Sequence, residues 1–594
     1  MVIQSNNLKL NNVTNLLIQI LDAKRLQLLI IVLSIFIVDA NTLFNQFVYD
    51  DNLQVVDNVW ITNVKYMPDI FNNDATHSLL KGASNYYRPL MNIIYMINYY
   101  LFGLKPWGFH LVNVLLHVGV TILVFSVISL LIIKDKSTPS RSFLSIPFVA
   151  SLIFAVHPIN TEVVAWVACV PELSFTFFCL LSLYFHMKSL YNFDRGHFVS
   201  LAFFGIAIFC KETAVTLLPI LALYDYLYSP EKFDKRRYVM RYVPFISIVT
   251  FYLLIRFNAL GGMAPSSRHP ELNTFGVIIN VLPLFYQYLE KLLLPINLNA
   301  FYVLHPVHSI TELKWIYSLL IIIAYVALGY LLLKKNKTAF FGLMIITIPL
   351  LPVLYIRGLG ENTFSDRYLY FPSIGFAIIV GSLFTIKGIN TDSWKKPLSI
   401  LLISIWGVYS IGTIKRNIIW HDELRLWTDT VQKSPDSDLV HLQLGTALAK
   451  NENQDAAIKE YQESLRINPH YITHNNLGLA LFSKGNLDAA IQEYHEALRM
   501  NSNYMDAHNN LGTALANKGD LNAAILEFKE ALRLSPKDVD AHNNLGFTLA
   551  NKGDLDAAIQ EYHEALQINP NNEYAQNNLR LALEKKKINN DGRK

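Results

Sequence analysis

The chain has 594 residues, of which 52% are hydrophobic and only 16% are charged, and its formal net charge is +4. This length exceeds that of one soluble domain, and the apolar content excludes a disordered chain and predicts a polytopic membrane protein. The net charge is small, and the basic residues lie in short clusters between apolar runs, which argues against a nucleic-acid partner. The three cysteines lie in or beside apolar segments without CxxC spacing and support neither a disulfide framework nor a zinc site.

The first long apolar run covers residues 26–44 and is long enough to cross the roughly 30 Å hydrocarbon layer as a helix. It lacks a small-residue cleavage pattern, which predicts a retained span. The acids Asp50 and Asp51 follow directly, so two adjacent carboxylates are expected at a membrane face. Charges at that depth cost free energy unless they meet water, a partner or a substrate, which makes this pair a functional candidate. The alternative is the start of a solvated loop.

Ten further segments are apolar enough to cross the membrane, which predicts about 11 spans. The run 91–102 is too short to span and is expected to lie in the interface. Segment 275–294 holds Pro283, Gln287, Glu290 and Lys291, ends at Pro295, and is ambiguous. The later spans are predicted at 108–133, 146–166, 172–188, 198–210, 213–228, 242–257, 315–333, 338–356, 368–386 and 397–414.

The direction of the spans follows from lysine and arginine, which collect in short cytoplasmic loops. Basic clusters at 24–25, 134–141 and 232–241 agree on a cytoplasmic N-terminus. If 275–294 crossed, the lysines at 334–337 would lie outside, so the arrangement with this segment in the interface is preferred. The acid pair and everything after residue 415 then face the exoplasmic side.

The C-terminal part contains a repeat with a period of about 34 residues. Its glycines Gly445, Gly478, Gly512 and Gly546 are spaced by 33, 34 and 34 residues. An alanine follows each glycine by twelve residues, and an aromatic follows that alanine by four. This spacing lets paired helices pack closely at their small residues, and it resembles the tetratricopeptide repeat (TPR). We expect a solenoid of four repeats closed by a helix from about residue 573 to 587.

Each repeat carries one amide side chain immediately before its Leu-Gly pair. A polar side chain repeated on successive first helices forms a row along the concave face, where each amide can donate to and accept from an extended peptide. This row resembles the asparagine ladder of soluble O-linked N-acetylglucosamine transferases and is expected to bind peptide. The alternative is that the amides only bond to one another or to water. The row consists of Gln443, Asn476, Asn510, Asn544 and Asn578.

Several short polar motifs lie at the ends of predicted spans. With the preferred topology their charged groups converge on the exoplasmic face. Polar residues with only a structural role in the core would not need to lie on the same side of the membrane, so this convergence indicates a functional site. The motifs are Tyr49-Asp50-Asp51, Tyr87-Arg88-Pro89-Leu90, His110-Leu111-Val112-Asn113, His157-Pro158-Ile159-Asn160-Thr161-Glu162, Lys211-Glu212-Thr213 and Asp366-Arg367-Tyr368-Leu369-Tyr370-Phe371-Pro372-Ser373.

In the order of these motifs and the appended repeats, the chain resembles the transmembrane and TPR-containing family of protein O-mannosyltransferases, of the GT-C class. The resemblance covers nearly the whole chain. It implies a donor sugar, mannose or another hexose, carried on a polyprenyl or dolichyl phosphate and transferred to Ser or Thr hydroxyls of proteins. It also implies a cytoplasmic membrane location in a prokaryote or the endoplasmic reticulum in a eukaryote, with the repeats on the exoplasmic side recruiting the polypeptide acceptor.

The residue types fit this chemistry. A hydroxyl needs a carboxylate base, for which Asp50 or Asp51 is placed. The departing phosphate needs cations, and the planar fork of arginine suits its oxygens. The adjacent acids are alternatively a ligand pair for Mg²⁺ or Mn²⁺. The predicted phosphate ligands are Arg88, Arg367 and Lys211. The predicted substrate-orienting residues are His157, Glu162, Glu212 and Tyr368.

Three other functions are consistent with parts of this pattern. A transporter would place intramembrane charges along a substrate path, but the hydrophobic segments show no inverted repeat. A scaffold that only anchors the repeats would need one or two spans. Transfer of a lipid-linked sugar to a glycan or lipid would leave the repeats to organise partners.

The predicted fold is all-α, with a membrane helical bundle followed by a TPR α-solenoid. The parts are a membrane domain at 1–415 with its first exoplasmic loop at 45–107, a connector at 416–437, the solenoid at 438–587 and a polar tail at 588–594.

Overall fold

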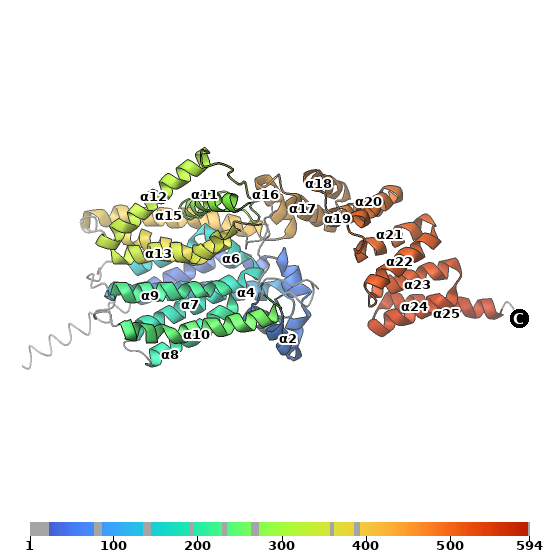
Figure 1. Ribbon diagram of the computed structural model, residues 1–594, viewed down its shortest axis with the longest axis horizontal. Helices are drawn as coiled ribbons and strands as arrows, with labels where there is room; N and C mark the ends of the chain where they lie inside the picture. Colours follow the sequence, from blue (N-terminus) through green and yellow to red (C-terminus); the bar gives the residue numbers. More distant parts are fainter. Residues whose placement is uncertain are drawn as a thin grey trace, which may run out of the picture. The chain divides into compact units, whose positions relative to one another are not determined.

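The computed structural model describes residues 23–75, 86–134, 144–189, 194–228, 235–262, 273–356, 362–384 and 392–591. These residues form helices joined by loops and contain no strand, so the all-α prediction is confirmed. The chain divides into two compact units, Met1–Leu426 and Trp427–Lys594 (Figure 1). Parts of the predicted loop 45–107 and tail 588–594, together with Lys136, Arg141 and Lys232 of the basic clusters, lie outside the described residues.

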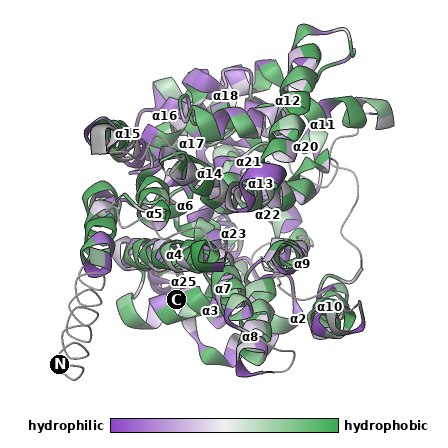
Figure 2. Cartoon of the chain, turned by 90° about the vertical axis from the view of Figure 1, so that its left-hand side faces the viewer, coloured by the Kyte–Doolittle hydropathy of each residue, from purple (hydrophilic) through white to green (hydrophobic). Residues whose placement is uncertain are grey.

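The first unit is a bundle of apolar helices that begins with a helix over Ala23–Phe44. In Figure 2, α4 and α5 are coloured as hydrophobic along most of their length. The further helices are α2 (Met67–Asn72), α3 (Pro89–Phe102), α4 (Pro106–Lys134), α5 (Ile146–Val156), α6 (Thr161–Ala165), α7 (Val170–Lys188), α8 (Arg195–Cys210), α9 (Leu217–Tyr228), α10 (Lys235–Ala259), α11 (Thr274–Leu293), α12 (Leu313–Lys335), α13 (Lys337–Leu350), α14 (Tyr370–Leu383) and α15 (Asp392–Ile419).

Seven helices of the described residues are long and apolar enough to cross a membrane, and a bent pair makes an eighth if it is one span. All seven coincide with predicted spans, and α11 is not among them. The bent pair is Ile146–Val156 with Pro158–Ala165, which meet at 52°. The remaining predicted spans are shorter helices here, namely α8, α9 and α14.

The short helices are short because 3-10 turns break the apolar segments. These turns are η5 (Pro158–Asn160), η7 (Glu212–Thr216) and η10 (Asp366–Leu369). Each falls on a polar motif, where proline or charged groups disfavour a continuous apolar helix. The breaks therefore place the polar motifs at helix ends.

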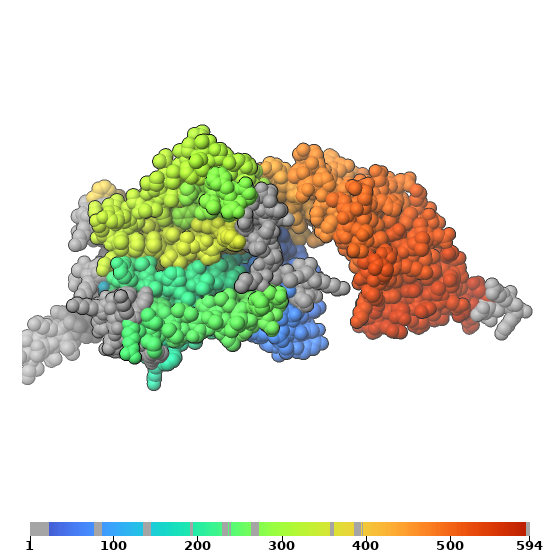
Figure 3. Space-filling model, viewed as in Figure 1, coloured from blue at the N-terminus to red at the C-terminus, as the bar shows by residue number. Residues whose placement is uncertain are grey.

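Close helix contacts in the bundle depend on small residues. Between α13 and α14, a Cβ on Gly342 would stand 2.9 Å from the carbonyl oxygen of Gly375. Small residues let membrane helices approach without a hydrophobic driving force. By contrast, α12 lies on the outer surface of this unit, visible in yellow-green in Figure 3, and only 11% of its apolar stretch is buried.

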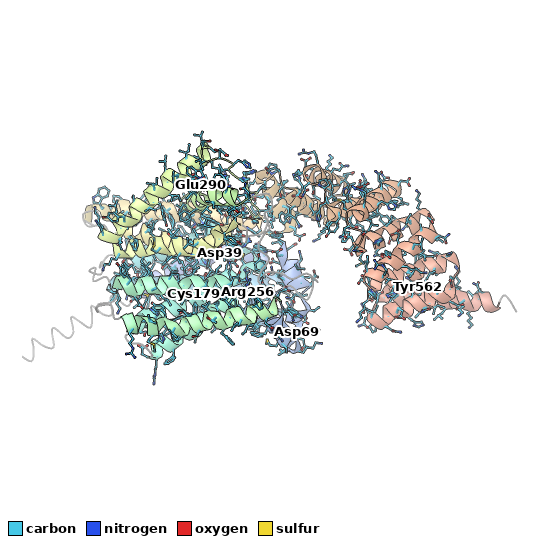
Figure 4. All side chains as sticks on the ribbon, in the orientation of Figure 1. Asp39, Asp69, Cys179, Arg256, Glu290 and Tyr562 are labelled. Carbon is cyan, nitrogen blue, oxygen red and sulfur yellow. The ribbon has the colours of Figure 1, made fainter. Side chains whose placement is uncertain are left out.

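The first helix is tied to the end of α15. The amide nitrogen of Asn417 donates to Asp39 Oδ1 at 3.2 Å and to the carbonyl oxygen of Val38 at 2.9 Å. Figure 4 labels Asp39 within the bundle, where its side chain is buried. The residues just before the acid pair are thus anchored to the last membrane helix.

The second unit contains four helix pairs and a closing helix. The closing helix ends at Asp591, four residues beyond the predicted end. The helices, after α16 (Glu423–Lys433), are α17 (Asp438–Lys450), α18 (Gln454–Ile467), α19 (Tyr471–Ser483), α20 (Leu487–Met500), α21 (Met505–Lys518), α22 (Leu521–Leu534), α23 (Val539–Lys552), α24 (Leu555–Ile568) and α25 (Glu573–Asp591).

The repeated glycines and aromatics pack within each pair. A Cβ on Gly512 would stand 2.8 Å from Phe528, and one on Gly546 would stand 2.8 Å from Tyr562. Tyr562, labelled in Figure 4, is therefore seated against the first helix of its own repeat. This confirms the predicted packing role of the small residue, with the aromatic inside the pair.

A histidine–glutamate bond joins the two helices of every repeat. Nδ1 of His508 lies 2.6 Å from Glu527 Oε2, and its Nε2 lies 3.1 Å from the carbonyl oxygen of Ser502. Two acceptors on one imidazole favour the doubly protonated ring. Burial alone would lower the pKa of His508, but these hydrogen bonds raise it above its ordinary value. The other bonds of this kind are His441–Glu460, His474–Glu493 and His542–Glu561.

We expect the stability of the repeat unit to fall as pH rises from 6 to 8. Because the pKa of His508 is raised in the folded state, its stabilisation is complete below the unfolded pKa of about 6.5 and is lost as pH rises through the folded pKa. A hydrogen bond to a charged group contributes about 1.5–3 kcal/mol, so a shift of a few degrees in Tm is expected.

The matched variant is His508→Gln, because Gln576 takes the equivalent place in α25 and donates to the carbonyl oxygen of Pro570 at 2.7 Å. It keeps a loop hydrogen bond but removes the titrating group. Thermal unfolding of the detergent-solubilised chain should therefore depend less on pH in this variant. An unchanged pH dependence would contradict the assignment.

Candidate active site

Asp51 is a buried carboxylate held by backbone groups. Its Oδ1 accepts from Ala168 N at 2.7 Å and its Oδ2 from Val48 N at 3.1 Å. Burial raises the pKa of Asp51 well above its ordinary value, and these hydrogen bonds oppose that rise. The carboxylate thus fastens the loop to the turn just before α7.

Asp50 has a different environment from its neighbour. It is partly exposed and accepts no hydrogen bond from the described residues. Burial raises its pKa, and the charge of Arg367 acts in the opposite direction. A carboxylate without hydrogen-bond partners, near a cation and with a raised pKa, has the properties of a general base.

Arg367 is oriented by Glu162. Arg367 Nη1 donates to Glu162 Oε1 at 2.7 Å, and its backbone N donates to Oε2 at 3.1 Å. Ser365 Oγ also donates to Oε1 at 2.9 Å. The other N–H groups of the Arg367 guanidinium form no hydrogen bond with the described residues, and its side chain is 20% exposed. Arg367 therefore keeps N–H donors for a ligand, whereas Glu162 is fully engaged in holding it.

The other two cations are more fully paired. Lys211 Nζ donates to Glu172 Oε1 at 2.6 Å, and its side chain is only 3% exposed. Glu172 therefore pairs with Lys211 and lies 3.9 Å from Arg367 Nε. Arg88 donates through Nε and Nη2 to both oxygens of Glu212, at 3.1 and 2.7 Å. Burial would raise the pKa of Glu212, but Arg88 lowers it to about 2.

Tyr368 connects two of these cations. Its ring centroid lies 5.2 Å from Lys211 Nζ and 5.2 Å from the guanidinium carbon of Arg367. A cation over an aromatic face is stabilised by the ring quadrupole. The structure thus brings Asp50, Arg367, Tyr368 and Lys211 into one neighbourhood.

His157 is engaged elsewhere. Its Nε2 lies 3.2 Å from the carbonyl oxygen of Leu292, and its Nδ1 accepts from Ile159 N at 3.2 Å. Both ring nitrogens are occupied by backbone groups, so the imidazole caps the break after α5 and leaves neither nitrogen for a substrate.

The described residues add no further His, Cys, Asp or Glu ligand to the acid pair. Within the part of the chain that the structure describes, no group of three or more His, Cys, Asp or Glu residues is arranged to hold a metal. Both oxygens of Asp51 already accept backbone hydrogen bonds. Mg²⁺ is commonly bound by one or two carboxylates together with waters and substrate phosphates, so metal binding at the acid pair stays a prediction.

An apolar groove of about 460 Å³ lies between α11, α12 and α13. Val281, Phe285, Tyr325 and Leu354 are among the residues that line it. Leu354 and Tyr325 also pack against the hydrophobic cluster that contains Leu369. The groove is therefore continuous through apolar contacts with the residues beside Arg367.

The amide row in the repeat unit is part of a double row. Asn510 Nδ2 donates to Asn475 Oδ1 at 3.0 Å, and Asn544 Nδ2 donates to Asn509 Oδ1 at 3.2 Å. Asn578 repeats the bond with Asn543 at 2.9 Å. In the last three Asn-Asn pairs, the second residue thus donates to the first residue of the preceding pair. Gln443 is partly exposed on the first helix, and Asn476 accepts from Asn475 at 3.3 Å.

These bonds leave polar groups available along the row. The Oδ1 atoms of Asn510, Asn544 and Asn578 accept no hydrogen bond from the described residues, and all three side chains are partly exposed. An amide has two donors and one acceptor with two lone pairs, so each retains one donor and its acceptor. The mutual bonding therefore orients the amides without exhausting them.

Comparisons with known proteins find similarity in both parts of the chain. A tetratricopeptide repeat model matches residues 442–505, 475–539 and 509–573. The chain is 26% identical over 487 residues to protein O-mannosyl-transferase TMTC4 of Homo sapiens, covering 71% of this chain and 64% of the relative. It is 25% identical over 453 residues to protein O-mannosyl-transferase F38B6.6 of Caenorhabditis elegans, covering 75% and 63%.

The resemblance predicted from the motifs is confirmed. The chain spans about 64% of the length of the first curated relatives of this family that it matches. A shorter match to protein O-mannosyl-transferase TMTC2 of Homo sapiens is 31% identical over 269 residues and covers 41% of this chain and 31% of the relative.

Two of the solved structures that the chain resembles match a quarter to a third of it. The crystal structure of MamA is 23% identical with a TM-score of 0.23, covering 24% of this chain and 80% of MamA. The crystal structure of YrrB, a TPR protein with an unusual peptide-binding site, is 21% identical with a TM-score of 0.24, covering 32% of this chain and 95% of YrrB.

Proposed function

We propose that this chain transfers a hexose, mannose by its resemblance, from a polyprenyl or dolichyl phosphate to Ser or Thr hydroxyls of a polypeptide on the exoplasmic side. The observation that carries the proposal is that Asp50, which accepts no hydrogen bond from the described residues, lies within electrostatic reach of Arg367, which keeps guanidinium donors for a ligand. A base and a cation with these properties are what displacement of a lipid phosphate requires.

In the proposed reaction the acceptor oxygen attacks the anomeric carbon and the bond from that carbon to the phosphate oxygen breaks. Asp50 takes the hydroxyl proton, and the electron pair of the broken bond leaves with the phosphate. Arg367 stabilises the charge that grows on the phosphate, and its planar fork matches the oxygens. One displacement of this kind inverts the anomeric configuration.

The groove between α11, α12 and α13 supports a lipid-linked donor. Its lining is largely apolar, and two of the three helices around it, α12 and α13, are apolar enough to cross a bilayer. An isoprenoid chain there would replace membrane lipid without exposing polar groups. Contact between Leu354 and the cluster holding Leu369 supports placing the phosphate near Arg367.

The test is sugar transfer by the purified chain in detergent. Polyprenyl-phosphate [³H]mannose and a Ser/Thr-containing peptide are supplied, and the β-eliminated sugar is counted. The expected result is label on the peptide. Polyprenyl-phosphate glucose is supplied in a parallel reaction as the matched donor. Label on a glycan or lipid but not on peptide would favour the alternative acceptor, and movement of unaltered donor across sealed vesicles would favour a transporter.

We expect Asn510→Ala and Asn544→Ala to weaken acceptor binding. Each removes one amide oriented by its neighbour, and a hydrogen bond contributes about 0.5–1.5 kcal/mol, which corresponds to a rise in peptide KM of roughly two- to tenfold. The donor KM and kcat at saturating peptide should be unchanged.

The matched control is Asn517→Ala on the same helix, because this exposed amide donates only to the carbonyl oxygen of Thr513 at 2.8 Å. It should leave the peptide KM unchanged. Equal effects at Asn510 and Asn517 would contradict peptide binding by the row.

The side of the repeats is accessible to cysteine labelling. The native cysteines Cys169, Cys179 and Cys210 are all buried, so a cysteine introduced at Asn590 reports alone. We expect a membrane-impermeant thiol reagent to label it from the exoplasmic side. Labelling only from the cytoplasm would separate the repeats from the acid pair and end the recruitment model.

A further inference from the structure

The loop that carries Asp50 is attached to the segment where α15 ends and α16 begins. Gln46 N donates to the carbonyl oxygen of His421 at 2.9 Å. Asn52 Nδ2 donates to Glu423 Oε1 at 2.7 Å. These bonds stand on either side of Asp50, so both ends of its short loop are held by one stretch of chain.

A column of three aromatic rings makes the same connection. The rings of Tyr49 and Trp166 stack at 5.3 Å and 16°, and those of Trp166 and Trp420 stack at 5.5 Å and 24°. Both indoles are buried. Tyr49 precedes Asp50 directly, and Trp420 follows the last residue of α15. The column therefore runs from the acid loop through Trp166 to the end of the last membrane helix.

The same column contacts the phosphate-binding candidate. The guanidinium carbon of Arg367 lies 5.4 Å from the ring centroid of Trp166. Trp166 thus has the acid loop stacked on its ring and the cation over it. Trp166 therefore contacts both the loop of the base and the cation.

The backbone of the loop requires outside support. Tyr49 has φ = 56°, in the left-handed region that side chains other than glycine rarely adopt. Such conformations persist only where the surrounding contacts determine them, and they gather at functional sites. The ring column and the bonds to His421 and Glu423 supply that support.

Resting on the proposed function, we propose that Trp420 and Glu423 are positioning residues for Asp50. They touch neither substrate in the proposed reaction and act through Trp166 and Asn52. The stretch of chain that leads into the repeats therefore also orients the base. Loss of either contact displaces Asp50 relative to Arg367, which lowers the rate of transfer and leaves the affinity for donor and peptide unchanged.

The test compares Glu423→Ala with Glu423→Gln. Alanine removes the acceptor of the Asn52 bond, whereas the glutamine amide oxygen still accepts it. Small displacements of catalytic groups lower rates steeply, so Glu423→Ala should lower kcat about tenfold with both KM values within about twofold. Glu423→Gln should restore most of the rate. Asp429→Ala, which removes the α16 pair with Lys433 and leaves the Asn52–Glu423 bond in place, should retain the wild-type rate.

A parallel pair of variants tests the ring column. Trp420→Leu removes the stacked ring and should lower kcat as Glu423→Ala does, and Trp420→Phe, which keeps a ring, should recover part of it. Adding Asn52→Ala to Glu423→Ala should cause little further loss of kcat, because both changes remove one bond.

Two results would overturn the proposal. One is a wild-type kcat in Glu423→Ala, and the other is an equal loss in Glu423→Ala and Glu423→Gln. If the wild-type chain transfers no sugar, the proposed function has failed separately. The contact between Asn52 and Glu423 is then tested by Tm. A decrease in Tm in the double variant that is smaller than the sum of the decreases in Asn52→Ala and Glu423→Ala supports the contact, and additive decreases overturn it.

Discussion

We expect Asp50→Asn to lower the rate of sugar transfer by roughly 10²- to 10⁴-fold, the range that a positioned general base contributes. Asparagine keeps the shape of the side chain but cannot take the proton of the acceptor hydroxyl. Because Asp50 is partly exposed and accepts no hydrogen bond from the described residues, Tm should change little. The measurement is kcat at saturating donor and peptide, with Tm taken on the same preparation.

Asp51→Asn is the matched control and should behave differently. Its carboxylate is buried and accepts from Val48 N and Ala168 N. An amide can accept only one of these bonds well, and a buried N–H left unpaired costs about 1–3 kcal/mol. We therefore expect a lowered Tm. Full activity in Asp50→Asn together with lost activity and a normal Tm in Asp51→Asn would reverse the two roles.

The second large effect is expected at Arg367. Arg367→Lys keeps a positive charge that can pair with Glu162 but loses the planar fork that meets two phosphate oxygens. Removing one preorganised donor to developing charge costs about 10²- to 10³-fold in kcat. Burst and steady-state transfer from polyprenyl-phosphate mannose measure this loss. Arg367→Gln is less informative, because it leaves Glu162 buried without its cation and destabilises the fold by about 3–5 kcal/mol.

Arg88→Lys provides the comparison for this prediction. Arg88 already directs Nε and Nη2 to Glu212, so fewer of its donors remain for phosphate. Its substitution should therefore lower kcat much less than Arg367→Lys. A larger loss at Arg88 would move the phosphate away from Arg367.

The apolar segments could be predicted from sequence because length and hydropathy decide them. Seven helices coincide with predicted spans. The breaks in the other segments could not be predicted in detail, since hydropathy averages over a polar residue such as Lys211 at the end of α8. What shortens these helices is the need of His157, Glu212 and Asp366 to meet partners far away in sequence. The 3-10 turns at these positions are the result.

The site could be predicted only as a set of residue types on one side. The sequence indicates that Glu162 and Arg367 approach the same face, but not that Glu162 spends both oxygens holding Arg367. Trp166 and Trp420 carry no motif, because an indole in an apolar segment is typical of a core. Their part in the site is visible only from ring stacking between residues more than a hundred positions apart.

The repeats could be predicted much more fully than the site, because their contacts recur at a fixed separation in the sequence. The period predicts the helix pairs and the amide row. The second row was not predicted, although each Asn-Asn pair in the sequence contains it. The signal that could have found it is the pair itself, since two adjacent amides on a helix cannot both face the same neighbour.

The bonds between the amide rows join residues 35 positions apart at three successive steps. Each step is complete within two neighbouring repeats and needs nothing from the rest of the chain. A gene that gains or loses one whole repeat therefore keeps an unbroken line of amides and only changes its length. In the proposed recruitment of acceptor, the length of polypeptide held along the row is thus open to change by duplication, with no alteration to the membrane helices.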